Sequence, residues 1–276
     1  MQSRNFYPGD CRKQVDEFLD GFAPPEEPAE MVAGIVPHAG WKYSGKIAAR
    51  VWRTIAERSH PETIILLGAV HHAGVRGNSL YPEGAWETPL GPVEVDSQLA
   101  SKISSSIEHL VAQDAAAHDG EHSLEVQMPF IKAILPDAKV VPIAVPSSSN
   151  AVQLGDLLGH LVQGLPVVAV GSSDLTHYGE RQYGFAPRGT GPAAHEWLKS
   201  NDERLIKLLE ELLAEEIAPE VATHHNACGP GALAATTAFA RARRAEKGLV
   251  LEHATSEEVR PSGNFTAGVG YTGIVY

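Results

Sequence analysis

Cysteine is scarce in this chain of 276 residues, which contains only Cys11 and Cys228. Two cysteines can form no more than one disulfide, so the sequence is unlike that of a small secreted domain held by several disulfides. The N-terminal segment lacks the basic and apolar parts of a signal peptide, and no apolar run approaches the roughly 20 residues of a membrane helix. We therefore expect a cytoplasmic protein that does not act at a membrane.

Basic residues are also few: the chain contains 22 Lys and Arg residues and 34 Asp and Glu residues, which gives a net charge of −12. The phosphates of nucleic acids and of anionic lipids would be repelled by such a surface, so neither is an expected partner. Much of the acidity lies in one stretch, which we interpret as a helix face exposed to solvent rather than as a metal-capturing segment. Its acids are Asp202, Glu203, Glu210, Glu211, Glu215, Glu216 and Glu220.

Short apolar runs that end in glycine, proline or polar residues predict buried strands. Continuous apolarity, rather than alternation, is typical of strands covered on both faces of a sheet. The runs lie at 31–36, 63–68, 140–145, 166–171 and 267–276. Helical stretches alternate with them, at 45–57, 98–110, 123–134, 152–162, 202–213 and 232–247. The pattern predicts an α/β fold with one domain over residues 1–276, in which helices cover both faces of a central parallel or mixed sheet.

Histidines and a cysteine occupy turns next to these elements. His38 follows the first apolar run, His71 and His72 follow the second, and Cys228 precedes a helix whose first turn would contain Pro230. Side chains at the carboxyl ends of strands in an open α/β sheet converge where ligands bind. Histidine and cysteine bind transition metals, and a helix N-terminus stabilises a thiolate. The sequence therefore predicts a small metal site at this edge of the sheet.

Taken singly, these residues have simpler interpretations. His38 could be a hydrogen-bonded loop residue, and Cys228 could be a small buried hydrophobic residue. The adjacent His71 and His72 point in different directions, so at most one of them binds the ion, while the other orients it or meets the substrate. A metal-bound thiolate would also exclude a disulfide between Cys228 and Cys11.

A loop after the fourth apolar run contains an acid and a histidine three residues apart, Asp174 and His177. Such a pair can set the tautomer and basicity of the ring, which favours proton transfer; the alternative is a hydrogen bond that only braces the loop. The helix entrance at His122 is typical of a capped core helix, with Glu121 on the surface. The absence of a Gly-x-Ser-x-Gly motif argues against serine hydrolysis.

Together these motifs resemble those of the Memo family, and the resemblance extends over nearly the whole chain. The matching segments are NFYPG at 5–9, PHAG at 37–40, YSG at 43–45, GAVHH at 68–72, EHSLE at 121–125, SSDLTHYG at 172–179 and HNACG at 225–229. Bacterial and archaeal members are often called protein B of the AmmeMemoRadiSam gene association. The resemblance implies a fold similar to the catalytic subunit of type III extradiol dioxygenases, non-haem Fe(II) enzymes that open catechols with O₂.

The resemblance also implies roles for individual residues. It places the metal ligands at His38, His71 and Cys228, with Asp174 and His177 lining the same pocket. The extradiol dioxygenases use two histidines and a glutamate instead. A thiolate ligand shifts the metal preference of a site toward copper or zinc and alters the redox potential of the bound metal. Similarity of fold alone therefore does not imply that this chain cleaves catechol rings.

Three functions are compatible with such a site. The leading one is a redox enzyme with iron or copper that acts on a small oxygen-bearing substrate or on O₂. In it His177, beside Asp174, would move a proton, while His72 and His122 would hydrogen-bond to substrate oxygens. The second is a zinc-dependent hydrolase, in which the ion lowers the pKa of bound water. The third is a non-catalytic metal-binding module that recruits protein partners, as eukaryotic Memo proteins are usually described.

Overall fold

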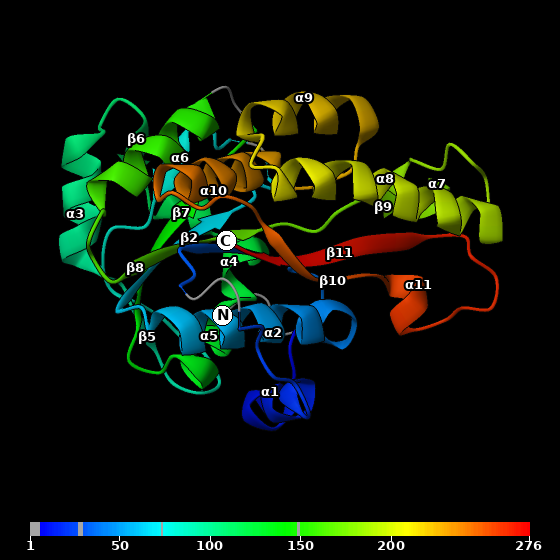
Figure 1. Ribbon diagram of the computed structural model, residues 1–276, viewed down its shortest axis with the longest axis horizontal. Helices are drawn as coiled ribbons and strands as arrows, with labels where there is room; N and C mark the ends of the chain where they lie inside the picture. Colours follow the sequence, from blue (N-terminus) through cyan, green and yellow to red (C-terminus); the bar gives the residue numbers. More distant parts are fainter. Residues whose placement is uncertain (1–5, 27–29, 73, 148–149) are drawn as a thin grey trace.

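A mixed β-sheet runs through the middle of the molecule in the computed structural model, which describes residues 6–26, 30–72, 74–147 and 150–276 (Figure 1). The strand order is β10-β11-β1-β8-β2-β7-β3-β6, and β9 pairs with β11 off this path. The central strands β1, β8, β2 and β7 are parallel, β11 is antiparallel to β1, and β3 is antiparallel to β7. The strands of the sheet are β1 Ala33–Val36, β2 Thr63–Gly68, β3 Asn78–Leu80, β6 Val111–Gln113, β7 Lys139–Ala144, β8 Val167–Ser172, β9 His177–Tyr178, β10 Leu249–Thr255 and β11 Gly268–Val275; β4 Ala85–Trp86 and β5 Val93–Glu94 form a separate pair.

Helices cover both faces of the sheet, as the sequence predicted. In Figure 1, α6, α8, α9 and α10 lie above the sheet, and α1, α2 and α5 lie below it. The helices are α1 Cys11–Leu19, α2 Trp41–Ser59, α3 Ser97–Ser106, α4 His122–Glu125, α5 Met128–Ile134, α6 Asn150–Leu161, α7 Glu180–Tyr183, α8 Pro192–Glu210, α9 Ala214–His224, α10 Pro230–Ala242 and α11 Ser256–Val259, with a 3₁₀-helix at Ala116–His118. None of the described helices has the length and apolar character needed to span a bilayer.

Alternate residues of the central strands face two separate hydrophobic cores. In β2, Ile65 and Leu67 pack on the side of α6 and α10, whereas Ile64 and Leu66 pack on the side of α2 and α5. All six residues of β2 are buried. This two-sided burial explains why the strand sequences are continuously apolar, and it confirms the predicted α/β class.

The predicted helix at 123–134 is wrong, because the chain forms two short helices there. α4 ends at Glu125 and α5 begins at Met128. Pro129 lies in the first turn of α5, where its missing N–H costs least. The side chain of Gln127 lies fully buried at the break and bonds to Trp52 and Pro37.

The helical expectations near the C-terminus also need correction. The stretch predicted at 202–213 begins inside α8, which extends from Pro192 to Glu210, and α9 was not predicted. α10 ends at Ala242 rather than at 247, because Arg244 takes a left-handed conformation with φ of 68°. Among the acids expected to face solvent, Asp202 is fully buried.

Candidate metal centre

Three neighbouring parallel strands deliver residues to one edge of the sheet. β8 lies between β1 and β2, and Ser172 at the end of β8 is level with the last residue of each neighbour. His38 and His71 follow those two neighbouring strand ends. Cys228 does not follow a strand but lies in the turn between α9 and α10, which reaches the same edge of the sheet. His225 begins this turn in a left-handed conformation, with φ of 52°, and so ends α9.

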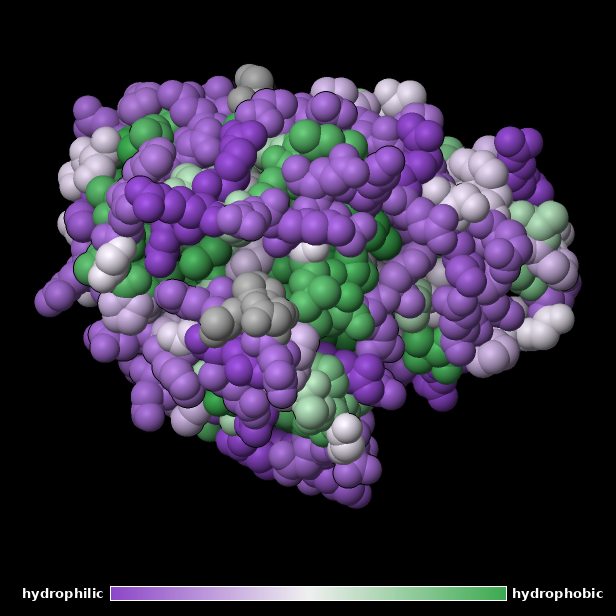
Figure 2. Space-filling view, viewed as in Figure 1, coloured by the Kyte–Doolittle hydropathy of each residue, from purple (hydrophilic) through white to green (hydrophobic). Residues whose placement is uncertain are grey.

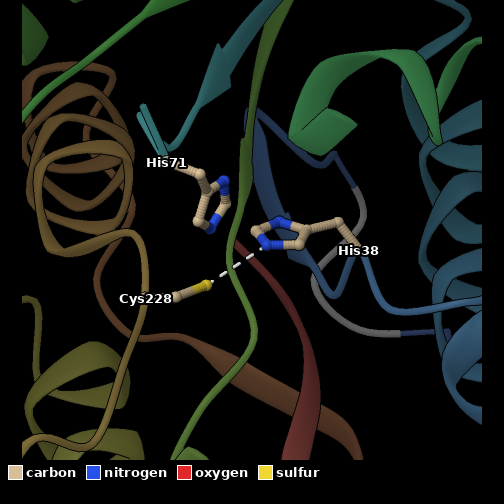
Figure 3. Close-up of side chains that lie close together, drawn as sticks. All are labelled: His38, His71 and Cys228. Atoms are coloured by element: carbon tan, nitrogen blue, oxygen red, sulfur yellow. Dashed lines mark hydrogen bonds between the residues drawn. The ribbon is translucent and has the colours of Figure 1, made fainter. Parts of the chain in front are cut away.

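The side chains of His38, His71 and Cys228 point toward one another (Figure 3). The Sγ of Cys228 lies 3.2 Å from Nε2 of His38, and the three ligand atoms all lie within 4.8 Å of one another. The two imidazole rings are nearly perpendicular, with centroids 5.2 Å apart. His38 is buried, Cys228 is half-buried and His71 is the most exposed. The structure thus gathers three residues that are far apart in the sequence.

Ser172 fixes the tautomer of His38. The Ser172 hydroxyl donates its single hydrogen to the Ser123 carbonyl at 2.7 Å, so Ser172 Oγ can only accept from other groups. It lies 3.1 Å from Nδ1 of His38, which must therefore carry the proton of the neutral ring. Nε2 of His38 is left with its lone pair directed at Cys228.

Glu121 orients His71 in the same way. One carboxylate oxygen accepts from the backbone amide of His71 at 2.7 Å, and the other lies 2.9 Å from Nδ1 of its ring. Nδ1 donates to the carboxylate, so the lone pair of Nε2 is free. Glu121 was expected on the surface, yet it is 2% exposed. A sequence pattern cannot tell a cap carboxylate that faces solvent from one that faces a buried histidine.

The hydrogen bonds keep Glu121 ionised. Burial raises the pKa of this carboxyl group, but donors from the His71 ring, the His71 amide and the Ser123 amide outweigh burial and hold the pKa well below its usual value. The carboxylate therefore supplies a fixed negative charge behind His71. A carboxylate behind a metal-binding imidazole holds the orientation of the ring and favours the approach of a cation.

Cys228 does not have the low thiol pKa that its place before α10 suggested. Burial, followed by the charge of Asp174, raises the pKa of the thiol far above its usual value. The raising influences outweigh the helix N-terminus because the thiol is desolvated. Ser173 Oγ and the Asp174 carbonyl oxygen each lie 3.7 Å from Sγ. The group is a protonated thiol unless a cation displaces the proton.

Asp174 holds the loop that carries His38. One of its oxygens accepts from the backbone amides of His38 at 2.8 Å and of Ala39 at 3.1 Å. Burial raises the pKa of Asp174, while the proximity of His177 and these two amides lower it. Within the described residues Asp174 and His177 interact electrostatically but share no hydrogen bond. The predicted carboxylate–imidazole pair is therefore looser than expected.

The loop from Asp174 to His177 is supported from behind by a second buried acid. Asp202 accepts from the Thr176 amide at 3.0 Å and from His253 Nε2 at 3.0 Å. A side chain at Gly270 would place its Cβ 1.8 Å from Asp202, so only glycine permits this approach. Asp202 is thus a structural support of the candidate site, which its acidic surroundings in the sequence concealed.

A cavity of about 440 Å³ is lined by residues that contact His38, although none of the three candidate ligands is among its described lining residues. His122, Asp174 and His177 line it, together with aromatic residues. The His122 ring lies 4.6 Å from that of His71 and 5.2 Å from that of His38, measured between centroids. His72 does not line this cavity, and its Nε2 is buried without a hydrogen-bond partner in the described structure.

Burial lowers the pKa of both cavity histidines. For His122, the neighbouring His71 lowers it further and Glu121 opposes the shift. For His177, the charge of Asp174 opposes the shift. Both rings are therefore neutral near pH 7, and each presents one nitrogen that can accept a proton. The ring of Tyr183 packs edge-on against His177, with centroids 4.9 Å apart.

A second group of donor atoms includes His71, Glu121 and His122, also within 4.8 Å of one another. Its carboxylate already accepts three N–H groups, from His71 twice and from Ser123. A cation there would have to displace those donors. In the group of His38, His71 and Cys228, a cation would have to displace only the thiol proton that lies against Nε2 of His38. This group fits a transition-metal ion better, because imidazole and thiolate are preferred ligands of iron, copper and zinc.

Both cysteines are free, as predicted. Cys11 is buried at the start of α1, where its thiol donates to the Pro8 carbonyl oxygen at 3.0 Å. Cys228 lies at the sheet edge with the two histidines. The two thiols therefore belong to unconnected parts of the fold.

Comparison with known proteins is consistent with these features. The sequence model of the family described as Memo-like protein matches residues 5–275. A MEMO1 family protein of Pyrococcus furiosus is 33% identical over 98% of this chain and 95% of its own. One from Pyrococcus abyssi is 34% identical over 95% and 92%, and one from Methanopyrus kandleri is 31% identical over 98% and 95%.

A solved structure shares the fold at much lower sequence identity. The crystal structure of an uncharacterized protein from Escherichia coli K12 superposes with a TM-score of 0.55 and 13% identity. The match covers 89% of this chain and 99% of the other. At this identity the similarity concerns the arrangement of strands and helices alone.

Proposed function

This chain belongs to the Memo family, and we propose that it is a redox enzyme that binds one ion of iron or copper through His38, His71 and Cys228. One observation carries the proposal. Both imidazoles have Nδ1 fixed by an acceptor, which leaves Nε2 of each ring free for a cation, and one ring nitrogen of each histidine lies within 4.8 Å of the other and of Sγ of Cys228. Positioning of this kind is typical of histidines that bind a metal through one nitrogen.

The proposed substrate is a small oxygen-bearing molecule that occupies the cavity of about 440 Å³. The cavity is lined by Phe6, Tyr43, Tyr183 and Tyr271, which favours a planar or unsaturated compound. A three-ligand ion supplies open coordination positions and the ability to exchange electrons with a bound substrate or with O₂. The substrate would thus lie between the aromatic wall and the histidines.

His177 would accept a proton from the substrate. Its ring is neutral near pH 7 because burial lowers its pKa, and it lines the cavity. The charge of Asp174 would stabilise the imidazolium that forms. His122, which lines the same cavity, would hydrogen-bond to a substrate oxygen; Phe6 stacks on its ring with centroids 4.7 Å apart.

Anaerobic purification from unsupplemented cells, followed by elemental analysis and O₂-uptake assays with catechols and related enediols, tests the proposal. Stoichiometric iron or copper together with substrate-dependent O₂ uptake would support it. Stoichiometric zinc with ester hydrolysis would favour the hydrolase instead. Protein without a bound transition metal, or bound metal without any turnover, would contradict the enzymatic proposal; the second result would favour a metal-binding module.

A further inference from the structure

A smaller cavity of about 210 Å³ lies apart from the candidate metal centre. Its walls come from the segment between β3 and β4, from β4 itself, from the 3₁₀-helix and from α4. His38, His71 and Cys228 are not among its lining residues, nor are the histidines of the larger cavity. The proposed redox function therefore leaves this cavity unexplained.

Three aromatic rings meet nearly at right angles on its wall. The Tyr81 and Trp86 rings have centroids 5.4 Å apart at 68°, Tyr81 and His118 5.5 Å apart at 88°, and Trp86 and His118 5.9 Å apart at 89°. Mutually perpendicular rings form the corner of a box whose faces carry negative electrostatic potential. Such corners bind organic ammonium ions through cation–π attraction.

His118 presents an unused acceptor at this cavity. It is 6% exposed, and its Nε2 lies 3.0 Å from the Ser79 carbonyl oxygen, to which it must donate. The neutral ring, whose pKa is lowered by burial, then has its lone pair on Nδ1. Nδ1 is buried and has no hydrogen-bond partner in the described structure. A buried acceptor of this kind costs free energy unless a ligand donates to it.

Trp86 contributes a second unsatisfied group. Its indole N–H is buried and has no hydrogen-bond acceptor among the described residues. Two residues that line the cavity therefore carry one acceptor and one donor that the described protein does not pair. A ligand that carries both an N–H group and an oxygen atom would satisfy both.

The charge of the lining favours a cation. Glu87, Asp119 and Glu125 line the cavity, and no lysine or arginine does so within the described chain. Glu125 is 7% exposed and accepts from the Tyr7 hydroxyl at 3.2 Å. Within the described residues, no three ligand atoms from these carboxylates and His118 all lie within 4.8 Å of one another. Their spacing is too wide for a bare metal ion and suits a polyatomic cation.

We propose that this cavity binds a small alkylammonium ion that carries an N–H group and a nearby oxygen atom, such as a protonated amino alcohol. The ammonium group lies against the rings of Tyr81 and Trp86 and donates to Nδ1 of His118. The carboxylates of Glu87 and Asp119 neutralise its charge at the rim. The oxygen atom accepts from the indole N–H of Trp86.

Calorimetric titration of the full-length protein with three matched compounds tests the proposal. N,N-dimethylethanolamine has the charge, the N–H and the oxygen; choline lacks the N–H; 3-methyl-1-butanol is a neutral compound of the same shape. We expect saturable binding of the amine, about threefold weaker binding of choline, and roughly tenfold or weaker binding of the alcohol. Sodium chloride at equal ionic strength serves as the control for salt effects.

Variants identify the cavity as the place of binding. Trp86→Leu should weaken binding of the amine by about tenfold, whereas Trp86→Tyr, which keeps an aromatic face, should lose less. Glu87→Gln and Asp119→Asn are exposed at the rim and should each weaken binding by about threefold. Glu83→Gln is a matched control, because Glu83 is exposed in the same segment but does not line the cavity.

Several results would overturn the proposal. Absence of saturable binding would mean that water alone occupies the cavity. Equal affinity for the amine and for 3-methyl-1-butanol would remove the role of charge. Unchanged affinity in Trp86→Leu would place any binding elsewhere. Should Trp86→Leu unfold, as judged by circular dichroism, the two rim variants decide the same question, since unchanged affinity in both would also refute this site.

Discussion

Buried acids on the two sides of the candidate metal centre, the side of His71 and the side of the loop that carries His177, differ in their pKa. On the ligand side, Glu121 accepts three N–H groups and its pKa is held low, so a permanent charge stands behind His71. On the side of the loop that carries His177, burial outweighs the hydrogen bonds and nearby charges, so the pKa values of Asp174 and of Asp202 are raised. The first side fixes the orientation of imidazole lone pairs, whereas the second places Asp174 and the neutral ring of His177 at the cavity. Metal binding and proton transfer should therefore be separable by mutation.

The largest effect should follow from removing a ligand. His38→Ala deletes a nitrogen 3.2 Å from Sγ of Cys228, and we expect metal affinity to fall by more than about 100-fold, with complete loss of any O₂-dependent activity. Competition with a chromophoric chelator measures the affinity. His72→Ala is the matched control and should keep its metal, because His72 is not among the residues whose ligand atoms gather here. Metal loss only in His72→Ala would reverse the ligand assignment.

Removing the proton acceptor should separate the two sides. His177→Ala should retain the metal and lose about 100-fold to 10,000-fold in kcat, the usual contribution of a general base. Elemental analysis and O₂ uptake on the same preparation give both numbers. If His177→Ala loses its metal as completely as His38→Ala, then His177 is a ligand and the distinction between the two sides is wrong.

A smaller effect should follow from Glu121→Gln on the ligand side. Glutamine keeps the size of the side chain but removes the charge that fixes Nδ1–H of His71. We expect metal affinity to fall by about 10-fold to 100-fold while the fold is kept. Glu203→Gln, on the exposed face of α8, is the control and should not change affinity. Equal affinity in both variants would show that Glu121 does not orient a ligand.

The strands that position the site could be predicted because their sequences are continuously apolar. β2 spans the predicted residues, and β1, β7, β8 and β11 differ from their predictions by no more than two residues at either end. Parallel strands then place their carboxyl ends together, which is why His38 and His71 could be expected near each other. The meeting of Cys228 with them was predicted from its place just before a helix together with the family resemblance, because no strand leads directly into residue 228.

The residues that support the site were not predictable from local sequence. Ser172 and Glu121 act through hydrogen bonds to histidines 134 and 50 positions away. Asp202 lies among acids expected to be exposed, and only its tertiary contacts with Thr176, His253 and Gly270 show that it faces inward. A signal for Glu121 was present, because a cap carboxylate directly precedes His122. Deciding which way that carboxylate faces requires the position of β2, which is a tertiary fact.

The smallest effect should come from Asp202→Asn, and it should depend on pH. Burial raises the pKa of Asp202 in the folded protein above the ordinary value of 3.8, although the bonds from His253 and Thr176 oppose this shift. The folded state therefore keeps this proton longer than the unfolded state, so its contribution to stability is present at low pH and is lost as the pH rises through the folded pKa. Asparagine does not titrate and keeps an oxygen for the Thr176 amide.

The free energy of unfolding of the Asp202→Asn variant, relative to that of the wild type, should therefore increase as the pH rises from about 4 and then become constant. Urea unfolding across this range measures the difference, with Glu203→Gln as a control that should show no such trend; a difference that falls with rising pH would mean that Asp202 is stabilised as a carboxylate, like Glu121.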